Sequence, residues 1–313
     1  MIVEKKCLSS GKFWCRVVRR VDSMKVSVNS GYLFIGLLLL VLAGGCSLQN
    51  ENRLTLDEWE RGFVISPGEN QEMKMFLWFY EWHLFDAVKP GIHTHGYGRP
   101  GDWSIFTRSI NESRAEGFME KNDMRLDVVS VDDDIEMVLT IRNTSNHDWP
   151  EIAAIIPCFN PGPPPNRSAD GLFRRTDLFI DMDSTHTYFI GPEEITPLNN
   201  RSIHFSHLLR PQVEKVRRES GPFIFDGKWP TSPVDAYKSL MVRESLDGKW
   251  VTGIAWENCL SAQGHNPWQC MHLSILVGPL KQGEKKEIRG KIYLFKGSKE
   301  DCYKRYLADF KSQ

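Results

Sequence analysis

The stretch WVTGIAWENCLSAQGHNPWQCMHLSILVGPLKQGEKKEIRGKIYLF, residues 250–295, decides the fold. Residues 250–255, 271–277 and 287–295 are rich in β-branched and aromatic side chains and lack the spacing of an amphipathic helix. Each of them therefore predicts a strand. Residues 257–270, between the first two strands, carry more functional groups than a simple connection needs, and loops held by strands on both sides often hold ligand chemistry.

The same loop also has a purely structural interpretation. In that interpretation Trp256, Trp268 and Met271 fill the end of a β-sandwich, while His265 and Asn266 bond to loop backbone, as most buried polar groups do. The sequence leaves both interpretations open.

Composition favours a globular, β-rich protein with many turns. Of the 313 residues, 41% are hydrophobic and 25% charged, and there are 17 Pro and 24 Gly. A helix is predicted to begin at Ser298 and to pack across a sheet edge, and residues 210–219 predict a short helix or a connection. The apolar stripe of the helix at Ser298 consists of Cys302, Tyr303, Tyr306, Leu307 and Phe310. Further strands are predicted at residues 72–85, 125–131, 135–142, 152–156, 187–190, 202–206 and 240–244.

The first 46 residues have the pattern of a secretory signal. A basic start at Met24 precedes an uncharged apolar segment, residues 31–42, and the small residues before Cys46 resemble a bacterial lipobox. We expect residues 1–46 to be a signal peptide, with Met24 as an alternative start, and Cys46 to be lipidated. Such a protein is anchored in the outer membrane, facing the periplasm or the exterior. A plain cleavable signal and an uncleaved anchor remain alternatives.

The rest of the chain is expected to form one unit. Residues 47–70 are polar and predict a flexible tether, and residues 71–313 predict a single β-sandwich domain. Residues 1–45 contain seven Lys/Arg and two Asp/Glu, which leaves 32 basic against 38 acidic residues and a net charge of −6. An acidic exported domain is a poor nucleic-acid binder, so we expect no nucleic-acid partner.

Four cysteines follow Cys46 in the sequence. Cys259 and Cys270 could form a disulfide across the loop in an oxidising compartment. Alternatively, these two and Cys158 and Cys302 are all small buried hydrophobic residues. No CxxC spacing is present, which disfavours a zinc site.

Two segments resemble the carbohydrate-active supersandwich group that includes galactose mutarotase. Residues 141–162 have an Asn-Thr turn followed by a strand leading into a corner similar to His-Pro-Tyr-Phe, and residues 278–284 resemble the late L-x-P-G-E turn of that group. The resemblance implies an all-β fold, a large antiparallel β-sandwich with a short C-terminal helix. Ile156 stands where the epimerases place a catalytic His, so the resemblance does not extend to classical epimerisation. The chain looks closer to a family of secreted bacterial lipoproteins of this architecture.

Histidines and one carboxylate are the candidate catalytic residues. His93 and His95 are two residues apart and would point to the same side of a strand, where they could hold a divalent metal together with His265, His272 or Glu257. A metal-free site, in which a His transfers protons beside a carboxylate such as Glu257 or Glu81, is the alternative. Another alternative is a carboxylate pair that hydrolyses glycosides.

Aromatic side chains point to a sugar as the partner. Flat rings stack on the C–H faces of sugars, and Asn and Arg side chains bond hydroxyls, although the Trp residues could equally belong to the core. The predicted substrate-binding residues are Trp82, Tyr97, Arg99, Trp103, Asn160, Asn266 and Trp268. The sequence thus predicts an epimerase-, lyase- or hydrolase-like protein that acts on carbohydrate, or alternatively a non-catalytic glycan-binding or structural envelope lipoprotein.

Overall fold

The computed structural model describes residues 53–59, 62–68, 73–82, 106–119, 123–161, 177–181, 183–223, 226, 229–264 and 269–311. All of these residues belong to one compact unit, which spans residues 49–313. Candidate residues elsewhere in the chain lie outside the described part.

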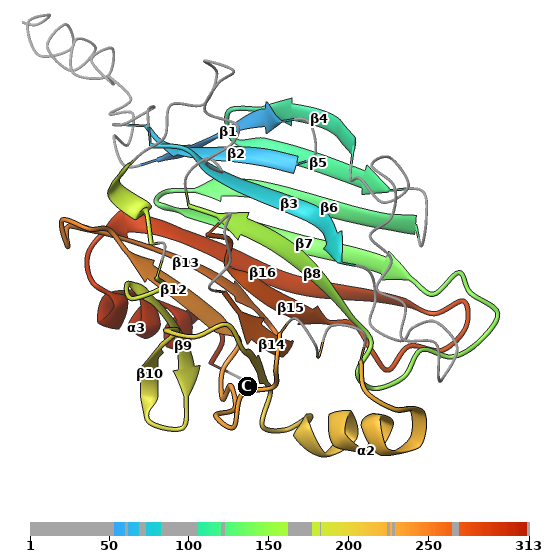
Figure 1. Ribbon diagram of the computed structural model, residues 1–313. Coiled ribbons are helices and arrows are strands. Elements are labelled where there is room, and N and C mark those ends of the chain that lie inside the picture. Colours follow the sequence, from blue (N-terminus) through green and yellow to red (C-terminus); the bar gives the residue numbers. More distant parts are fainter. Residues whose placement is uncertain are drawn as a thin grey trace, which may run out of the picture. The chain divides into compact units, whose positions relative to one another are not determined.

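One of the two sheets has nine antiparallel strands in the order β10-β9-β12-β13-β16-β7-β6-β5-β4 (Figure 1). The sheet is built around β13, β16 and β7, where Trp250 pairs with Lys296 and Lys285 pairs with Arg142. The bounds are β4 Phe106–Asn111, β5 Arg114–Met119, β6 Met124–Val131, β7 Asp134–Arg142, β9 Thr187–Gly191, β10 Glu194–Pro197, β12 Leu240–Glu244, β13 Trp250–Trp256 and β16 Lys285–Lys296.

The other sheet has seven antiparallel strands in the order β1-β2-β3-β8-β15-β14-β11. In its centre Ile275 of β15 pairs with Ile155 of β8, and Gln263 of β14 pairs with His272 of β15. The bounds are β1 Leu54–Trp59, β2 Gly62–Pro67, β3 Met75–Trp82, β8 Ala154–Asn160, β11 Ile203–Phe205, β14 Cys259–Gln263 and β15 His272–Leu276.

The main apolar core lies between the two sheets. Leu139 of β7 and Ile254 of β13, in the nine-stranded sheet, belong to the same buried cluster as Ile155 of β8 and Leu273 of β15. Because both sheets contribute one face to a shared core, the molecule is an antiparallel β-sandwich, as the sequence predicts.

Two helices cover other faces of the sheets. In α3, Lys299–Asp309, the Ser298 side chain accepts a hydrogen bond from the Asp301 N–H and closes a capping box. Cys302, Tyr306 and Phe310 of this region pack on Val242 and Val251. The sequence predicts that this helix crosses a sheet edge, but β12 and β13 are interior strands, so α3 covers the outer face of the nine-stranded sheet instead (Figure 1). A second helix among the described residues is α2, Arg210–Ser220, and no described helix is long and apolar enough to cross a bilayer.

Three further regions differ from the sequence prediction. The sequence predicts a tether over residues 47–70, whereas β1 and β2 form an antiparallel hairpin there with buried Leu54, Phe63 and Ile65. The predicted loop 257–270 contains a strand, β14, which pairs on both sides. Leu307, predicted to lie on the apolar stripe of the last helix, is 41% exposed.

Candidate functional site

A patch of polar side chains lies on the outer face of the seven-stranded sheet. The residues Ile155, Phe159, Leu273 and Ile275 of β8 and β15 point into the core between the sheets. Because side chains alternate along a strand, the residues between them point to the opposite face. Seven such residues form what we call the polar patch: Cys158, Asn160, Ser261, Gln263, Cys270, His272 and Ser274.

Strand register brings the patch together from three distant segments. Gln263 of β14 lies opposite His272 of β15, and Ser261 lies opposite Ser274, with their hydroxyl oxygens 2.8 Å apart. The Asn160 amide donates to Cys270 Sγ at 3.8 Å. All seven residues are buried. Hydrogen bonds within the patch are therefore shielded from water.

The Gln263 amide has an incomplete set of hydrogen bonds. Gln263 is 3% exposed, and among the described residues its Nε2 has no hydrogen-bond partner. A buried donor left unpaired costs about 1–3 kcal/mol, so such a group needs an explanation, and a molecule that bonds to it is one.

An apolar zone adjoins the patch on the same face. Ala154 and Ile156 of β8 and Phe205 of β11 pack against Val213 of α2 and against Trp229. The α2 segment therefore covers one end of this face, and Ile156 is part of an apolar contact rather than of the polar patch.

A buried charged network lies beside the patch. Arg243 of β12 is fully buried, its Nε donates to Thr187 Oγ1 at 2.8 Å, and it lies 3.9 Å from Asp181 Oδ2. Burial lowers the pKa of Arg243 to about 10. Asp181 opposes this by raising the pKa, and Cys270 and Cys158 raise it to a smaller extent. Gln269 Oε1 accepts from the Asp181 N–H at 2.8 Å, so the network fixes the residue that precedes Cys270.

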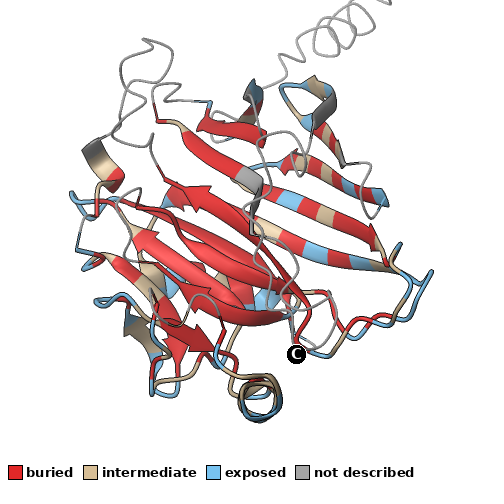
Figure 2. Cartoon of the chain, turned by 45° about the vertical axis from the view of Figure 1, so that its right-hand side comes forward, coloured by how far each residue is buried: buried red, intermediate tan, exposed pale blue. Residues whose placement is uncertain are grey.

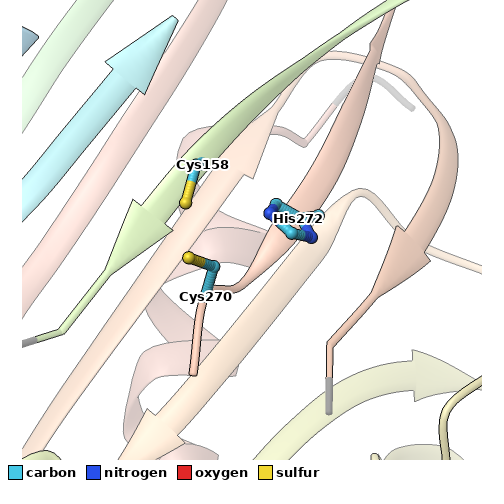
Figure 3. Close-up of side chains that lie close together, drawn as sticks. All are labelled: Cys158, Cys270 and His272. Atoms are coloured by element: carbon cyan, nitrogen blue, oxygen red, sulfur yellow. The ribbon is translucent and has the colours of Figure 1, made fainter. Parts of the chain in front are cut away.

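Three patch members could hold a metal ion. One Sγ each from Cys158 and Cys270 and one ring nitrogen of His272 all lie within 4.8 Å of one another (Figure 3). All four described cysteines are buried, and none of them forms a disulfide. Of the two alternatives that the sequence leaves open, the disulfide between Cys259 and Cys270 is therefore wrong, and the cysteine that lies near Cys270 is Cys158 instead.

The structure brings two of the predicted site residues together and separates a third from them. His272 and Asn160 both belong to the polar patch. Glu257 lies beside the far end of β15, because the neighbouring Asn258 carbonyl accepts from the Leu276 N–H at 3.1 Å. Four strand residues, about 13 Å at 3.3 Å each, separate that point from His272. The Glu257 carboxylate pairs instead with Arg289 Nε at 2.6 Å.

The remaining predicted site residues cannot be placed. Trp82 belongs to β3, but its side chain lies outside the described part. The candidates wholly outside the described residues are Cys46, His93, His95, Tyr97, Arg99, Trp103, His265, Asn266 and Trp268.

Sequence reasoning missed Gln263, Cys158, Cys270 and Arg243 as site residues. Gln263 and Cys270 stand in the segment that we interpret as a functional loop, so that segment is the signal by which they could have been found. Cys158 and Arg243 carry no such signal, because only the strand pairing brings them near the others.

Comparisons with known proteins give fold likenesses only. No family model matches the chain, and no curated protein matches it. Solved structures with a similar fold include a galactose mutarotase related enzyme from Lactobacillus acidophilus, with a TM-score of 0.39 and 9% identity over 79% of this chain and 98% of that chain. A galactose mutarotase-like protein from Lactobacillus casei has a TM-score of 0.39 and 11% identity over 77% of this chain and 99% of that chain.

A polysaccharide lyase is also similar, with a TM-score of 0.36 and 10% identity over 81% of this chain and 34% of that chain. These neighbours include the galactose mutarotase-like group that the turn motifs resemble. At such scores the likeness carries no argument about reaction or substrate, and the β-sandwich assignment stands on the strand order of this chain.

Proposed function

We propose that this chain binds a carbohydrate against the polar patch on the outer face of its seven-stranded sheet. The observation that carries the proposal is the buried Gln263 amide, whose Nε2 lacks a hydrogen-bond partner among the described residues. A sugar hydroxyl could accept from that N–H and bond to the neighbouring side chains at the same time.

The chemistry of the patch favours a neutral, hydroxyl-rich ligand. The outward-pointing described residues of β8, β14 and β15 include an amide pair, two hydroxyls and an imidazole but no Lys, Arg, Asp or Glu. A site for a phosphate or a carboxylate would place a cation there, because buried charges need a partner. The resemblance of residues 141–162 and 278–284 to the supersandwich group implies the same ligand class.

Catalysis is the second candidate function, and the buried His272 favours it. Histidine is suited to proton transfer near neutral pH. An epimerase-like, lyase-like or hydrolase-like reaction needs a second group, however, and Glu257 lies at the other end of β15. We therefore rank carbohydrate binding first, and the proton-transfer partners still open are His93, His95 and His265.

A glycan panel tests the binding proposal. The purified full chain should bind at least one neutral glycan, and Gln263→Leu should weaken that affinity about tenfold, the equivalent of 1.4 kcal/mol. Gln282→Leu is the matched control, because Gln282 is an exposed turn residue at a distance from the patch. Failure of the wild-type chain to bind any glycan, or an equal loss in both variants, would contradict the proposal.

We also propose that the protein is exported and anchored in the outer membrane by a lipid on Cys46. The support is the apolar segment 31–42 and the small residues before Cys46. Mass spectrometry of the N-terminal peptide from the membrane fraction should find Cys46 modified, and Cys46→Ser should abolish the modification. An unmodified, retained N-terminus would exclude the anchor without affecting the proposed ligand.

A further inference from the structure

We propose that Cys158, Cys270 and His272 bind one zinc ion. Their two Sγ atoms and one ring nitrogen lie within 4.8 Å of one another, and none of the three residues is more than 2% exposed. Figure 3 shows the two sulfur atoms directed toward each other, with the imidazole of His272 beside them.

Strand register makes this grouping a fixed feature of the sheet. Phe159 and Met271 exchange two backbone hydrogen bonds, at 3.1 and 2.7 Å, and Ile155 pairs with Ile275. Continuing the same register places Cys158 opposite His272 and makes Cys158 and Cys270 diagonal neighbours. Cys270 and His272 are two residues apart and so point to the same face.

The donor set suits zinc. Two thiolates and one imidazole are a known zinc ligand set that leaves one coordination position open, with Zn–S near 2.3 Å and Zn–N near 2.0–2.1 Å. Tetrahedral geometry with these bond lengths separates the ligand atoms by roughly 3.4–3.8 Å. The three ligand atoms would therefore have to move about 1 Å closer to one another to bind zinc, and rotation of their side chains can supply that movement.

A disulfide between Cys158 and Cys270 is the competing arrangement, and the strand geometry disfavours it. Diagonal cross-strand residues have Cα atoms about 7–8 Å apart. A disulfide usually spans Cα atoms about 4.4–6.8 Å apart. A metal ion bridges the longer separation, because it lies between the two sulfur atoms.

The other two buried thiols show what a purely structural cysteine looks like in this fold. Cys259 and Cys302 each pack within an apolar cluster. Burial raises the pKa of both thiols, that of Cys259 to about 11. Cys158 and Cys270 belong to no apolar cluster of the described residues, and both interact electrostatically with the Arg243 guanidinium.

The surroundings also hold the ligands in place. The Asn160 amide donates to Cys270 Sγ, and the bond from the Asp181 N–H to Gln269 Oε1 fixes the residue before Cys270. Such outer contacts orient metal ligands and tune their affinity. The zinc site deepens the proposed function, since it lies on the same sheet face. Its test measures metal content, so its outcome does not depend on whether the chain binds a glycan.

Metal analysis and cobalt substitution test the proposal. The full chain, dialysed after incubation with zinc alone, should retain one zinc ion per chain. Its cobalt form should show the thiolate-to-cobalt absorption of a sulfur-ligated site. Cys158→Ser and His272→Ala should each weaken zinc binding at least tenfold, whereas Cys259→Ser, a matched buried thiol, should leave it unchanged.

Two results would overturn the proposal. The first is a wild-type chain that binds neither zinc nor cobalt, and the second is a peptide map with Cys158 and Cys270 joined in a disulfide. If Cys158→Ser or His272→Ala does not fold, the cobalt spectrum of the wild-type chain decides, because it requires no substitution.

Discussion

Two groups of strands, one in each sheet, treat their polar side chains in opposite ways. Along β6 and β7 of the nine-stranded sheet, buried residues largely alternate with half-buried or exposed ones, and most polar side chains meet water. Along β8 and β14 of the seven-stranded sheet every residue is buried, and in β15 only Leu276 is half-buried (Figure 2). The polar groups of β8, β14 and β15 are therefore removed from solvent.

This difference matters because burial changes what a polar group costs. An exposed Ser or Arg exchanges one hydrogen bond for another with water, whereas a buried one must find a partner inside the protein. A sheet that buries both faces and still keeps an amide pair, two hydroxyls and an imidazole on one of them has a reason beyond packing to do so. We infer that the outer face of the seven-stranded sheet is the functional face.

The largest expected effect follows from breaking the buried ion pair beside the patch. Arg243→Met leaves the Asp181 carboxylate buried without its cation, which should lower the free energy of unfolding by about 3–5 kcal/mol. Arg125→Met is the matched change on β6, where the Arg125 side chain is 48% exposed and pairs with Asp127, and it should cost about 0–1 kcal/mol. Urea unfolding monitored by tryptophan fluorescence measures both values.

Equal costs at the two arginines, which both belong to the nine-stranded sheet, would mean that burial does not change the cost of a charged group as we infer. Adding Asp181→Asn to Arg243→Met should recover part of the lost stability, because it removes the unpaired charge and keeps an acceptor for the His186 N–H.

A smaller effect is expected within the patch itself. The hydroxyls of Ser261 and Ser274 bond to each other across β14 and β15 at 2.8 Å. Ser261→Ala alone leaves the Ser274 hydroxyl buried, which should cost about 1–3 kcal/mol, whereas Ser261→Ala with Ser274→Ala should cost clearly less than twice that. A double-mutant cycle by chemical unfolding gives the coupling, and strict additivity would show that the two hydroxyls do not depend on each other.

The same contrast explains what the sequence can and cannot predict. The β6–β7 hairpin follows directly from alternating apolar residues around three aspartates, and Asp132 adopts the positive φ of 53° that such a turn needs. The helix α3 follows from its cap at Ser298. These elements are encoded by neighbours in the chain, so local patterns reveal them.

The strand β14 and the polar patch are not encoded that way. Residues 259–263, CLSAQ, have neither strict alternation nor an aromatic residue, so they resemble the polar loop around them. Asn160 and Cys270 are 110 residues apart and meet only because β8 pairs with β15. The spacing of residues along the sequence does not reveal how β8 pairs with β15. For this reason the disulfide considered for Cys270 is one with Cys259, which is nearer in the sequence.

A pH effect should come from a histidine on the inner side of the same sheet. His204 is buried against Phe189, and its Nδ1 lies 2.9 Å from the Val234 carbonyl. Burial lowers the pKa of His204, and the hydrogen bond to Val234 partly opposes that shift. Of the charged residues near it, Arg210 lowers this pKa further, while Asp235 raises it. The unfolded chain therefore binds the His204 proton more readily than the folded chain, so stability should fall as the pH drops below about 6.5.

The slope of stability against pH measures this effect. A single group contributes at most about 1.4 kcal/mol per pH unit. His204→Gln should reduce the slope between roughly pH 5 and pH 6.5 relative to the wild-type chain. An unchanged slope would mean that acid destabilisation has its source in other groups.

The smallest expected effect is at Glu257, which the sequence places among the catalytic candidates. Its side chain is 25% exposed and its partner Arg289 is 63% exposed, so the ion pair is a surface pair worth about 0.2–1 kcal/mol. Glu257→Gln should therefore change stability little, and it should leave glycan binding and zinc content at wild-type values, because Glu257 lies at the end of β15 away from His272. The measurements are calorimetric titration with the glycan and metal analysis, and Gln263→Leu serves as the contrasting variant on the patch. A strong loss of glycan binding in Glu257→Gln would move the site to the opposite end of β15 and would make the Gln263 amide a structural feature of the sandwich.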